Sequence, residues 1–598
     1  SIMNNKNKQL FSEFSPVSTE QWMERVTADL NGADFDKKLV WQNLSGIKIN
    51  PCYNAEDRIT QLKNTGENSQ SLVNYRRVLV ETAESGNKLA TKAVEEGMNG
   101  IIFQLKENVP VTTLLNGINL NTTTVSFEII ADAITFAKDL VVFAKDSDLK
   151  GYINTGIISN YVTTGSFDEN QIEVAGELVK LTAGFPNFKA ITVSGTEYLD
   201  SGANQVQEIA YTLNSLVFLI EKLSEKGIEV QAIFDNLNFK LAIGLEYFVE
   251  IGKFRAFNNL LAEVAAKYGV AEFSNTITAK TSIWSKSVTD AETNLLRCTT
   301  EAMSAILGNV DGVLIDAYDK EFKNPSDFSS RIAGNITTIL REESYFGKVS
   351  NPVDGSYYIE EVSTKIAEKA LELFKAIEAE GGFYIAFENE KIQSQIAEIR
   401  LQKLKLISQR RTPMVGINKY PNLMEKITAN LLSKGAADNL KVLTPRRASL
   451  EIEAMRRVTE ELVAETNVRP IVQLASYGNL NMRKARAAFA YDFIGVSGFS
   501  VLQEQSFTSA ESAATESAKS NSHVVVICSS DEDYDETAVD FVKAFRAINT
   551  SKVLLLAGAP KNMDELTEAG LDGVVNMRTD VLVTLASIQE KVQKTLKS

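Results

Sequence analysis

Short apolar runs rich in β-branched residues alternate with long amphipathic stretches from about residue 89 to residue 382. The runs read GIIFQLK, TVSFEII, KGYINTG, KAITVSG, NTITAKT and DGVLIDAY in chain order. Buried parallel strands have this appearance, and each needs a crossover helix before the next strand. A long βα series of this kind is typical of a (β/α)8 TIM barrel, which takes about 250 residues. We therefore predict an α/β chain with a barrel at residues 86–385.

The fifth strand of this barrel has two candidate positions. The pattern alone favours EVQAIF at residues 229–234. LNFKLAIG at residues 237–244 follows closely and competes with it.

A second alternation of strands and helices occupies residues 468–598. Its apolar runs are PIVQLAS, FSVLQEQ, HVVVICS, KVLLLAG and DGVVNM, with helix patterns between them. Regular βα units of this kind predict a doubly wound, flavodoxin-like domain. Such a fold binds ligands at the carboxyl ends of its strands, which here carry Ser476, Ser529, Ser530, Asp531, Gly558 and Ala559.

Two further regions complete the predicted organisation. Residues 1–85 are polar and irregular, with one amphipathic stretch at residues 19–30, and we expect this N-terminal extension to contact a partner. Residues 386–467 form a charged helical linker with repeated arginine pairs. We favour a linker helix that packs between the domains over an anion-binding patch, because charge runs of this kind discriminate weakly.

The chain has a single histidine, His523. Histidine is the commonest general base and a leading metal ligand near neutral pH. Ser-His-Asp triads, Cys-His pairs and histidine-rich zinc sites are therefore excluded. His523 introduces the run HVVVICSS, so we expect an imidazole at the edge of a strand.

The composition favours a soluble protein of a reducing compartment, which we take to be the cytoplasm. Cys52, Cys298 and Cys528 lie far apart without a CxxC, so we expect neither a disulfide framework nor a thiolate metal site. The net charge of -15 argues against nucleic-acid binding, because Lys and Arg neutralise phosphates. No apolar run approaches the roughly 20 residues of a membrane span, and the first residues carry no signal-peptide pattern.

The familiar nucleotide, zinc-protease and nucleophile motifs GxGxxG, GxxxxGK, HExxH and GxSxG are all absent. Catalytic residues of a barrel lie at the carboxyl ends of its strands. The candidates there are Gln104, Glu128, Asn154, Lys280 and Asp316. Asp316 and Glu128 would suit an acid/base pair, but we favour polar residues satisfied at strand ends. TTGSF at residues 163–167 either cradles an anion through backbone N–H groups or forms a plain turn.

Ordered sequence blocks run along nearly the whole chain. They are SGTEYLDSGANQVQEIAYTLN, FVEIGKFRAFNNLLAEV, TEAMSAILGNVDG, PSDFSSRIAGNITTILREES, NPVDGSYYIE and VGINKY. These blocks resemble the methylmalonyl-CoA mutase family. The amino-terminal block FSPVSTEQWMERVTADLNGADFDKKLVWQ and the late blocks KARAAFAYDFIGVSGF and VVVICSSDEDYDETA are similar to the small (beta) subunit of the bacterial heterodimeric enzymes. The resemblance implies that the fifth barrel strand lies at residues 237–242.

The resemblance also implies a reaction. Enzymes of this family interconvert methylmalonyl-CoA and succinyl-CoA by a radical rearrangement with adenosylcobalamin, a step of propionate metabolism. The large subunit threads the CoA ester through its barrel and holds the corrin on its last domain, with the histidine of a DxHxxG motif on cobalt. A related small subunit pairs with it and binds no cofactor.

The barrel residues that carry this chemistry in active members are replaced here. Thr278 and Leu314 stand where the family has two histidines. Lys280 and Asn154 stand where it has glutamines. The family's DPWGGS is altered at Asn351, Val353 and Asp354, and the RQYAGF stretch has no counterpart.

The last domain departs from the active pattern as well. SYGNLNMRKARA occupies the region of the DxHxxG motif. Ser529, Ser530 and Asp531 replace the SxL loop, and Ala557-Gly558 replaces the paired glycines beside the corrin. Thr and Leu offer no imidazole nitrogen for cobalt or substrate.

These departures imply a non-catalytic small subunit with no catalytic, cofactor-binding or metal-binding residues of its own. Its partner would be the large (alpha) subunit, in a heterodimer, and adenosylcobalamin would belong to that partner. One alternative is a CoA-ester-binding regulatory module of the same complex, with Lys280 near the ester. Another is an independent enzyme that uses Asp316, Glu128 or Lys280. A sister mutase for a different acyl-CoA also stays open, because the substrate-reading residues belong to the other subunit.

Overall fold

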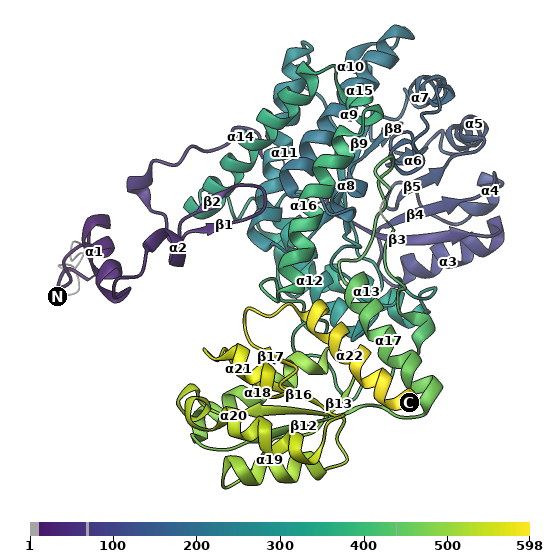
Figure 1. Ribbon diagram of the computed structural model, residues 1–598. Coiled ribbons are helices and arrows are strands. Elements are labelled where there is room, and N and C mark those ends of the chain that lie inside the picture. Colours follow the sequence, from purple (N-terminus) through teal and green to yellow (C-terminus); the bar gives the residue numbers. More distant parts are fainter. Residues whose placement is uncertain (1–10, 67–70, 438) are drawn as a thin grey trace, which may run out of the picture.

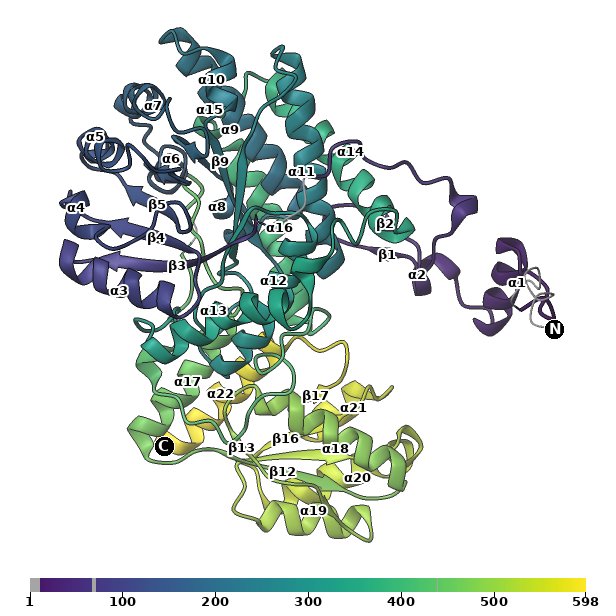
Figure 2. The same ribbon diagram turned by 180° about the vertical axis from the view of Figure 1, so that it is seen from behind.

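The computed structural model describes residues 11–66, 71–437 and 439–598. A large body is built around a strand barrel, a smaller sheet domain lies against one end of it, and an N-terminal arm projects from its side (Figure 1). The view from behind shows the same three parts (Figure 2). Within the described residues, no helix is both long enough and apolar enough to cross a membrane.

The barrel is a nine-stranded parallel sheet in the order β7-β6-β5-β4-β3-β11-β10-β9-β8. The first and last strands of that order are separated by Ala190 alone, so the ring nearly closes on itself. This arrangement confirms the predicted α/β fold with a barrel. The strands are β3 Val73–Val80, β4 Gly100–Leu105, β5 Thr124–Ile129, β6 Gly151–Asn154, β7 Phe188–Lys189, β8 Ile191–Ser194, β9 Leu237–Ile243, β10 Thr276–Thr281 and β11 Gly312–Leu314.

Helices surround the strands on the outside (Figure 1). They are α3 Ala83–Glu95, α4 Val111–Leu114, α5 Ala133–Phe143, α6 Ser159–Thr164, α7 Asn170–Leu181, α8 Thr196–Asp200, α9 Gln205–Glu225, α10 Val230–Phe234, α11 Tyr247–Lys267, α12 Asn294–Leu307 and α13 Asp327–Glu342, with short 3-10 turns at Ala291–Thr293 and Phe346–Lys348. In α9, every residue from Gln205 to Ile220 is buried, because α14 (Tyr357–Ala379) covers α9 and α11 as a further layer. A helix buried all round needs partners for its polar groups, and Asn214 Nδ2 donates to the Phe374 carbonyl at 3.1 Å.

The barrel begins earlier in the chain than expected. Strand β3 pairs with both β4 and β11, yet it lies within the residues assigned to the N-terminal extension. Its sequence VNYRRVLV carries two adjacent arginines, which hide the apolar pattern of a buried strand. Arg76 points outward to Glu96, the residue that follows α3, at 3.1 Å, and Arg77 points into the barrel. The boundary at residue 85 is therefore wrong by one strand.

The fifth barrel strand lies at β9 (Leu237–Ile243), as the family resemblance implied. The preference of the pattern for residues 229–234 is wrong, because residues Val230–Phe234 form the short helix α10. Ile233 and Phe234 of this helix are buried. The apolar run therefore reflects a buried helix and not a strand. The last barrel strands agree with the runs that predicted them.

The last domain has a parallel sheet in the order β13-β12-β15-β16-β17, with β14 also paired to β12. This order, in which the second strand lies outside the first, is that of flavodoxin-like folds. Val524 and Val526 of β15 face one core, and Val525 and Ile527 face the other. The elements are β12 Ile471–Ser476, α18 Leu480–Gly495, β13 Ser500–Val501, β14 Gln505–Ser506, α19 Ala510–Lys519, β15 Val524–Cys528, α20 Asp531–Ile548, β16 Val553–Ala557, α21 Met563–Ala569, β17 Gly573–Val575 and α22 Val581–Lys597.

The connecting segment contains α15 Phe383–Glu388, α16 Lys391–Ser408, a 3-10 turn at Ala429–Leu431 and α17 Leu450–Thr466. Helix α17 packs against α22 of the last domain. Four arginines in α17 and just before it are held by carboxylates, in the pairs Arg446–Glu451, Arg447–Glu453, Arg456–Glu460 and Arg457–Glu461. Their pairing agrees with a packing helix rather than an anion-binding patch.

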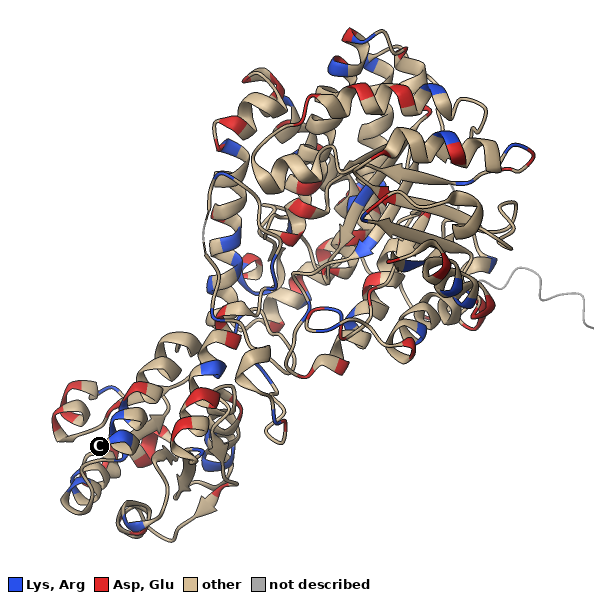
Figure 3. Cartoon of the chain, turned by 90° about the vertical axis from the view of Figure 1, so that its right-hand side faces the viewer, with Lys and Arg blue, Asp and Glu red and all other residues tan. Residues whose placement is uncertain are grey.

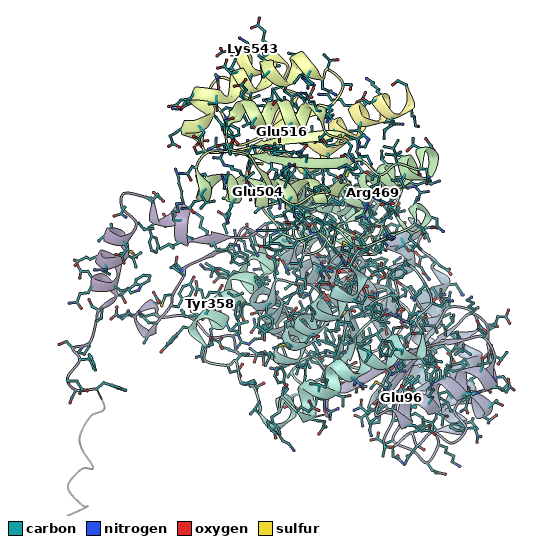
Figure 4. The ribbon with its side chains drawn as sticks, turned by 90° about the horizontal axis from the view of Figure 1, so that it is seen from below. Glu96, Tyr358, Arg469, Glu504, Glu516 and Lys543 are labelled. Atoms are coloured by element: carbon teal, nitrogen blue, oxygen red, sulfur yellow. The ribbon has the colours of Figure 1, made fainter. Side chains whose placement is uncertain are left out.

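The N-terminal arm contains α1 Thr19–Asp29, α2 Phe35–Leu39, β1 Trp41–Gln42, β2 Lys48–Ile49 and a 3-10 turn at Ala55–Asp57. Helix α1 has a complete capping box at Ser18 but buries none of its residues. The arm is anchored at its base, where Tyr53 contacts Tyr358 of α14 with ring centroids 6.1 Å apart (Figure 4). Ile47 and Ile49 beside it are buried in the barrel core.

Candidate functional site

Charged side chains gather inside the barrel at the carboxyl ends of its strands. The side-on view shows Lys, Arg, Asp and Glu among these strands (Figure 3). Gln104, Glu128, Asn154, Lys280 and Asp316 were predicted at this end, and the structure places them there. Ion pairs also bring three cations that were not predicted into this group, Arg77, Lys240 and Lys320. We call the barrel-mouth cluster the set Arg77, Gln104, Glu128, Lys240, Lys280, Asp316 and Lys320.

The two carboxylates of the cluster are held by different cations. Arg77 Nη1 donates to Asp316 Oδ1 at 2.5 Å. Lys240 Nζ donates to Glu128 at 3.1 Å, and Gln104 Nε2 donates to Glu128 at 2.9 Å. The geometry is that of two separate ion pairs rather than of an acid/base dyad.

The charges around these carboxylates decide their protonation. Burial alone would raise the pKa of Glu128, but Lys240 and Arg77 outweigh it and lower that pKa to about 2. Burial opposes ionisation of Asp316 as well, yet Arg77 and two lysines hold its pKa well below the ordinary value. A general base works best with a pKa near the operating pH. Both groups stay ionised at neutral pH, which argues for a structural role.

Lys280 is the most loosely held cation of the cluster. Its Nζ lies 3.9 Å from Asp316 Oδ2, and burial together with Lys320 lowers its pKa to about 8. Lys320 Nζ lies closer to the same carboxylate oxygen, at 3.5 Å. Lys280 therefore exchanges protons close to neutral pH without a tight partner.

Below the barrel-mouth cluster the barrel interior is filled by side chains. Tyr75, Ile102, Tyr152 and Leu314 pack together, and each is at most 5% exposed. The rings of Tyr75 and Tyr152 lie 6.1 Å apart, and the Tyr75 hydroxyl is 3.1 Å from Ser126 Oγ. Leu314, one of the two positions where the resemblance expected a histidine, is thus part of an apolar plug.

The remaining barrel positions are satisfied locally. Thr278, the other such position, donates from its hydroxyl to Asn238 Oδ1 at 3.1 Å. Asn154 Oδ1 accepts from the Gly156 N–H at 2.9 Å. Asn154 is thus a polar residue satisfied at a strand end, and Thr278 is satisfied within its strand.

The TTGSF segment is a turn that ends a helix. Helix α6 stops at Thr164, and Gly165 adopts φ 79°, the left-handed conformation common after a helix. The Gly165 N–H donates to the Tyr161 carbonyl at 2.8 Å, and the Ser166 N–H donates to Thr164 Oγ1 at 3.3 Å. Because these N–H groups are used internally, the anion-cradle interpretation is not supported.

Side chains also close the carboxyl edge of the last domain. Arg486 of α18 donates from Nη1 to the Ala557 carbonyl at 2.9 Å and to the Ser529 carbonyl at 3.3 Å. Its Nη2 pairs with Asp531 at 3.0 Å. The Tyr534 hydroxyl accepts from the Ser529 N–H at 2.8 Å and donates to the Ala557 carbonyl at 2.7 Å. The ends of β15 and β16 are thus bridged by one guanidinium and one phenol.

The other residues of this edge are engaged as well. Ser529 Oγ donates to the Tyr477 carbonyl at 2.6 Å. Ser476 Oγ donates to Glu504 at 2.6 Å. Gly558 has φ 151°, and a Cβ there would lie 2.5 Å from Arg486 Nη1. A side chain at this position would strain the backbone and would displace the Arg486 guanidinium.

His523 lies at the opposite edge of the same sheet. It precedes β15, and its Nδ1 accepts from the Ile471 N–H at 3.0 Å. Burial lowers its pKa, so the imidazole is neutral. This confirms the strand-edge interpretation. Across the residues that the structure describes, no group of three or more His, Cys, Asp and Glu side chains has a metal-binding arrangement.

Comparison with known proteins identifies the family of this chain. The family model described as "Methylmalonyl-CoA mutase" matches residues 82–490. The chain belongs to the methylmalonyl-CoA mutase family. The "Methylmalonyl-CoA mutase small subunit" of Porphyromonas gingivalis is 32% identical over 98% of this chain and 99% of its own length. That of Streptomyces virginiae is 28% identical over 94% and 96%.

Other members of the mutase family match less of the chain. The protein of Cereibacter sphaeroides named "Methylmalonyl-CoA mutase" is 26% identical over 77% of this chain and 71% of its own length. The resemblance drawn from the sequence blocks is thereby confirmed. The matches that extend over nearly the full length of both chains carry the small-subunit name.

Proposed function

We propose that this chain is a non-catalytic small subunit that supports an adenosylcobalamin-dependent mutase. The isomerisation of methylmalonyl-CoA and succinyl-CoA would be carried by the large subunit. The observation that carries the proposal is the Arg486 bridge across the strand ends of the last domain. In this family that edge is where the cobalt cofactor would be held.

The residues at this edge do not fit that cofactor. A corrin needs a flat, open surface and, in this family, an imidazole nitrogen for cobalt. Here Arg486 fills the surface, and its charge is paired with Asp531. His523 is at the other edge of the sheet, and its Nδ1 is already engaged with the Ile471 N–H. We therefore derive no reaction step through a corrin held by this chain.

The barrel interior supports the same proposal. A CoA ester that passed along the axis would have to displace Tyr75, Ile102, Tyr152 and Leu314, which fill it. Displacing buried side chains from a close-packed interior costs several kcal/mol, at roughly 1.5–3 kcal/mol for each large apolar side chain. The filled interior thus favours a structural role for the barrel, in its fold and its surface, over a role in binding a CoA ester.

The projecting arm favours the presence of a protein partner. Apolar side chains lie exposed on and around α1, with Phe11 and Val17 at 71% and Phe14 at 68%. Exposed apolar groups gathered on one projecting segment mark a surface for another protein. We propose that the arm contacts the large subunit in a heterodimer.

A second candidate function is a CoA-ester-binding regulatory module of the same complex. It is favoured by the charge surplus at the mouth, where four cations face two carboxylates and Lys280 is loosely held. Phosphate and carboxylate groups would be attracted there. Calorimetric titration of coenzyme A into the isolated chain, with Lys280→Gln as the comparison, separates it from the leading proposal.

The leading proposal is tested with the purified chain, alone and co-expressed with its candidate large subunit. We expect no change in corrin absorbance and no methylmalonyl-CoA turnover from the chain alone. Both should appear with the partner, at one cofactor per pair. Tight corrin binding or turnover by the chain alone would contradict the proposal.

A further inference from the structure

A separate cavity of about 310 Å³ lies at the rim of the barrel, away from the barrel-mouth cluster. Three parts of the chain line it: the base of the arm, the loops after β8, β9 and β10, and the connecting segment. The lining is mainly apolar and includes Trp41, Leu44, Leu245, Trp284, Leu406 and Met414. The volume is at the lower end of the range for small-molecule sites, roughly 300–1,000 Å³.

One carboxylate in this cavity has no ammonium within ion-pair distance among the described residues. Glu246 follows β9, is half-buried, and accepts a 2.5 Å hydrogen bond from the neutral amide of Gln205. The ammonium that lines the same cavity, Lys403 Nζ, donates instead to the Ala203 carbonyl at 2.7 Å. Its charge lies 5.4 Å over the ring of Trp284.

The two neighbouring carboxylates already have an ion-pair partner. Glu208 and Glu250 both form ion pairs with the buried Lys253, the first at 2.6 Å. Three carboxyl groups therefore share two ammonium groups in this region. Glu246 and Glu250 both line the cavity, and Glu246 is the one without an ion pair among the described residues. Burial raises the pKa of Glu246, and the more distant charge of Lys403 lowers it but does not outweigh burial, because a carboxylate is costly in a mainly apolar lining. A positively charged ligand would balance it.

We infer that this cavity binds a small amphipathic cation, an aryl or alkyl ammonium. Its charged end would meet Glu246, and its apolar body would lie against Trp41 and Leu245. Ammonium-to-carboxylate hydrogen bonds are the stronger kind, and tryptophan rings attract cations further. The inference does not depend on the proposed function, since it concerns neither the corrin nor the CoA ester.

The test uses the full chain and three probes of similar shape: 2-phenylethylamine, 2-phenylethanol and 3-phenylpropionate. Binding is followed by calorimetry and by intrinsic fluorescence, because two of the three tryptophans of the chain line the cavity. We expect saturable binding of the amine and at least tenfold weaker binding of the alcohol and the acid.

Variants assign the binding to this cavity. Glu246→Gln should weaken the amine at least tenfold and remove its advantage over the alcohol. Glu81→Gln, an exposed carboxylate at the same end of the barrel, should leave all three probes unchanged. Leu44→Trp, which keeps Glu246 and narrows the cavity, should weaken the amine and the alcohol together. Equal binding of amine and alcohol, amine binding that survives Glu246→Gln, or no saturable amine binding would each overturn the inference.

Discussion

At the scale of single residues, Arg77 holds the barrel-mouth cluster together. It donates to Asp316 at 2.5 Å and contributes to the low pKa of Glu128, which lies two strands away on β5. Replacing it by an apolar residue leaves Asp316 with two lysines at 3.5 and 3.9 Å. Removing one partner of a buried ion pair is costly, because the other charge stays buried.

Arg77→Leu should therefore lower the free energy of unfolding by about 3 kcal/mol. The measurement is the urea midpoint of the chain. Arg25→Leu is the matched control, because Arg25 pairs with Asp29 on the exposed helix α1. That change should cost less than about 1 kcal/mol. Equal midpoints for the two variants would contradict the role given to Arg77.

The carboxylate of Glu128 predicts an acid dependence of stability. Its pKa is about 2 in the folded chain and 4.5 ordinarily. Between these values the unfolded chain binds the proton first, so stability present above pH 4.5 is lost as the pH falls toward 2. The loss from this one group amounts to at most about 3 kcal/mol.

Glu128→Gln should flatten that part of the pH profile, measured as the urea midpoint from pH 5 to pH 2.5. The exposed Glu107 follows the preceding strand, and Glu107→Gln serves as the control. If both variants kept the slope of the unmodified chain, Glu128 would not be the group that titrates.

The sequence predicted where these residues lie better than what they do. Gln104, Glu128 and Asp316 could be placed together, because parallel strands bring their carboxyl ends to one edge. Their partners could not be predicted, because Arg77 was hidden in an unrecognised strand and Lys240 in a disputed one. Glu246 was missed for a different reason, since only the three-dimensional lining distinguishes it from other glutamates after strands.

At the scale of secondary-structure elements, the arm differs from the rest of the chain. Helices α1 and α2 bury no residues, whereas Ile47 and Ile49 further along the arm belong to the barrel core. The first part of the arm therefore adds little to the stability of the isolated chain. Its exposed apolar groups are available to a partner.

Deletion of residues 1–39 should leave the melting temperature within a few degrees but abolish association with the large subunit. Co-purification and gel filtration measure the association, and circular dichroism measures the melt. Phe14→Ser with Val17→Ser gives a milder version that keeps the length of the chain. If the shortened chain still associated fully with the large subunit, the arm would not be part of the interface.

Elements with a regular pattern were predicted well, and those under local constraint were not. The strands of the last domain alternate between two cores, and their continuous apolar runs made them plain. Strand β3 was missed because it carries two adjacent arginines. Their partners, Glu96 for Arg76 and Asp316 for Arg77, lie outside the strand and could not be recognised from the sequence. Helix α10 was misjudged because a buried single turn and a short strand share the same apolar composition.

At the scale of the whole molecule, the last domain extends further back along the chain than residue 468. Ile452, Met455 and Leu462 of α17 lie in the same core as residues of the sheet. Gln589 Nε2 of α22 also donates to the Met455 carbonyl at 2.7 Å. The helix is therefore a covering layer of that domain.

We expect the fragment 446–598 to fold cooperatively, and the fragment 468–598 to be less stable by several kcal/mol. Each large apolar side chain that loses its cover costs roughly 1.5–3 kcal/mol. Thermal melts of the two purified fragments, followed by circular dichroism, provide the measurement. Equal melting temperatures would place the boundary where the sequence analysis put it.

The guanidinium of Arg486 restricts how this chain can change by single substitutions. An imidazole introduced at the carboxyl edge of the last domain would meet a space that the arginine already fills. Loss of the arginine alone would take a donor from the Ser529 and Ala557 carbonyls. Either substitution alone lowers the stability of the folded domain. A route of single substitutions toward a cofactor-holding domain would therefore pass through a less stable chain. The proposed supporting role is therefore easier to reach by single substitutions than to leave.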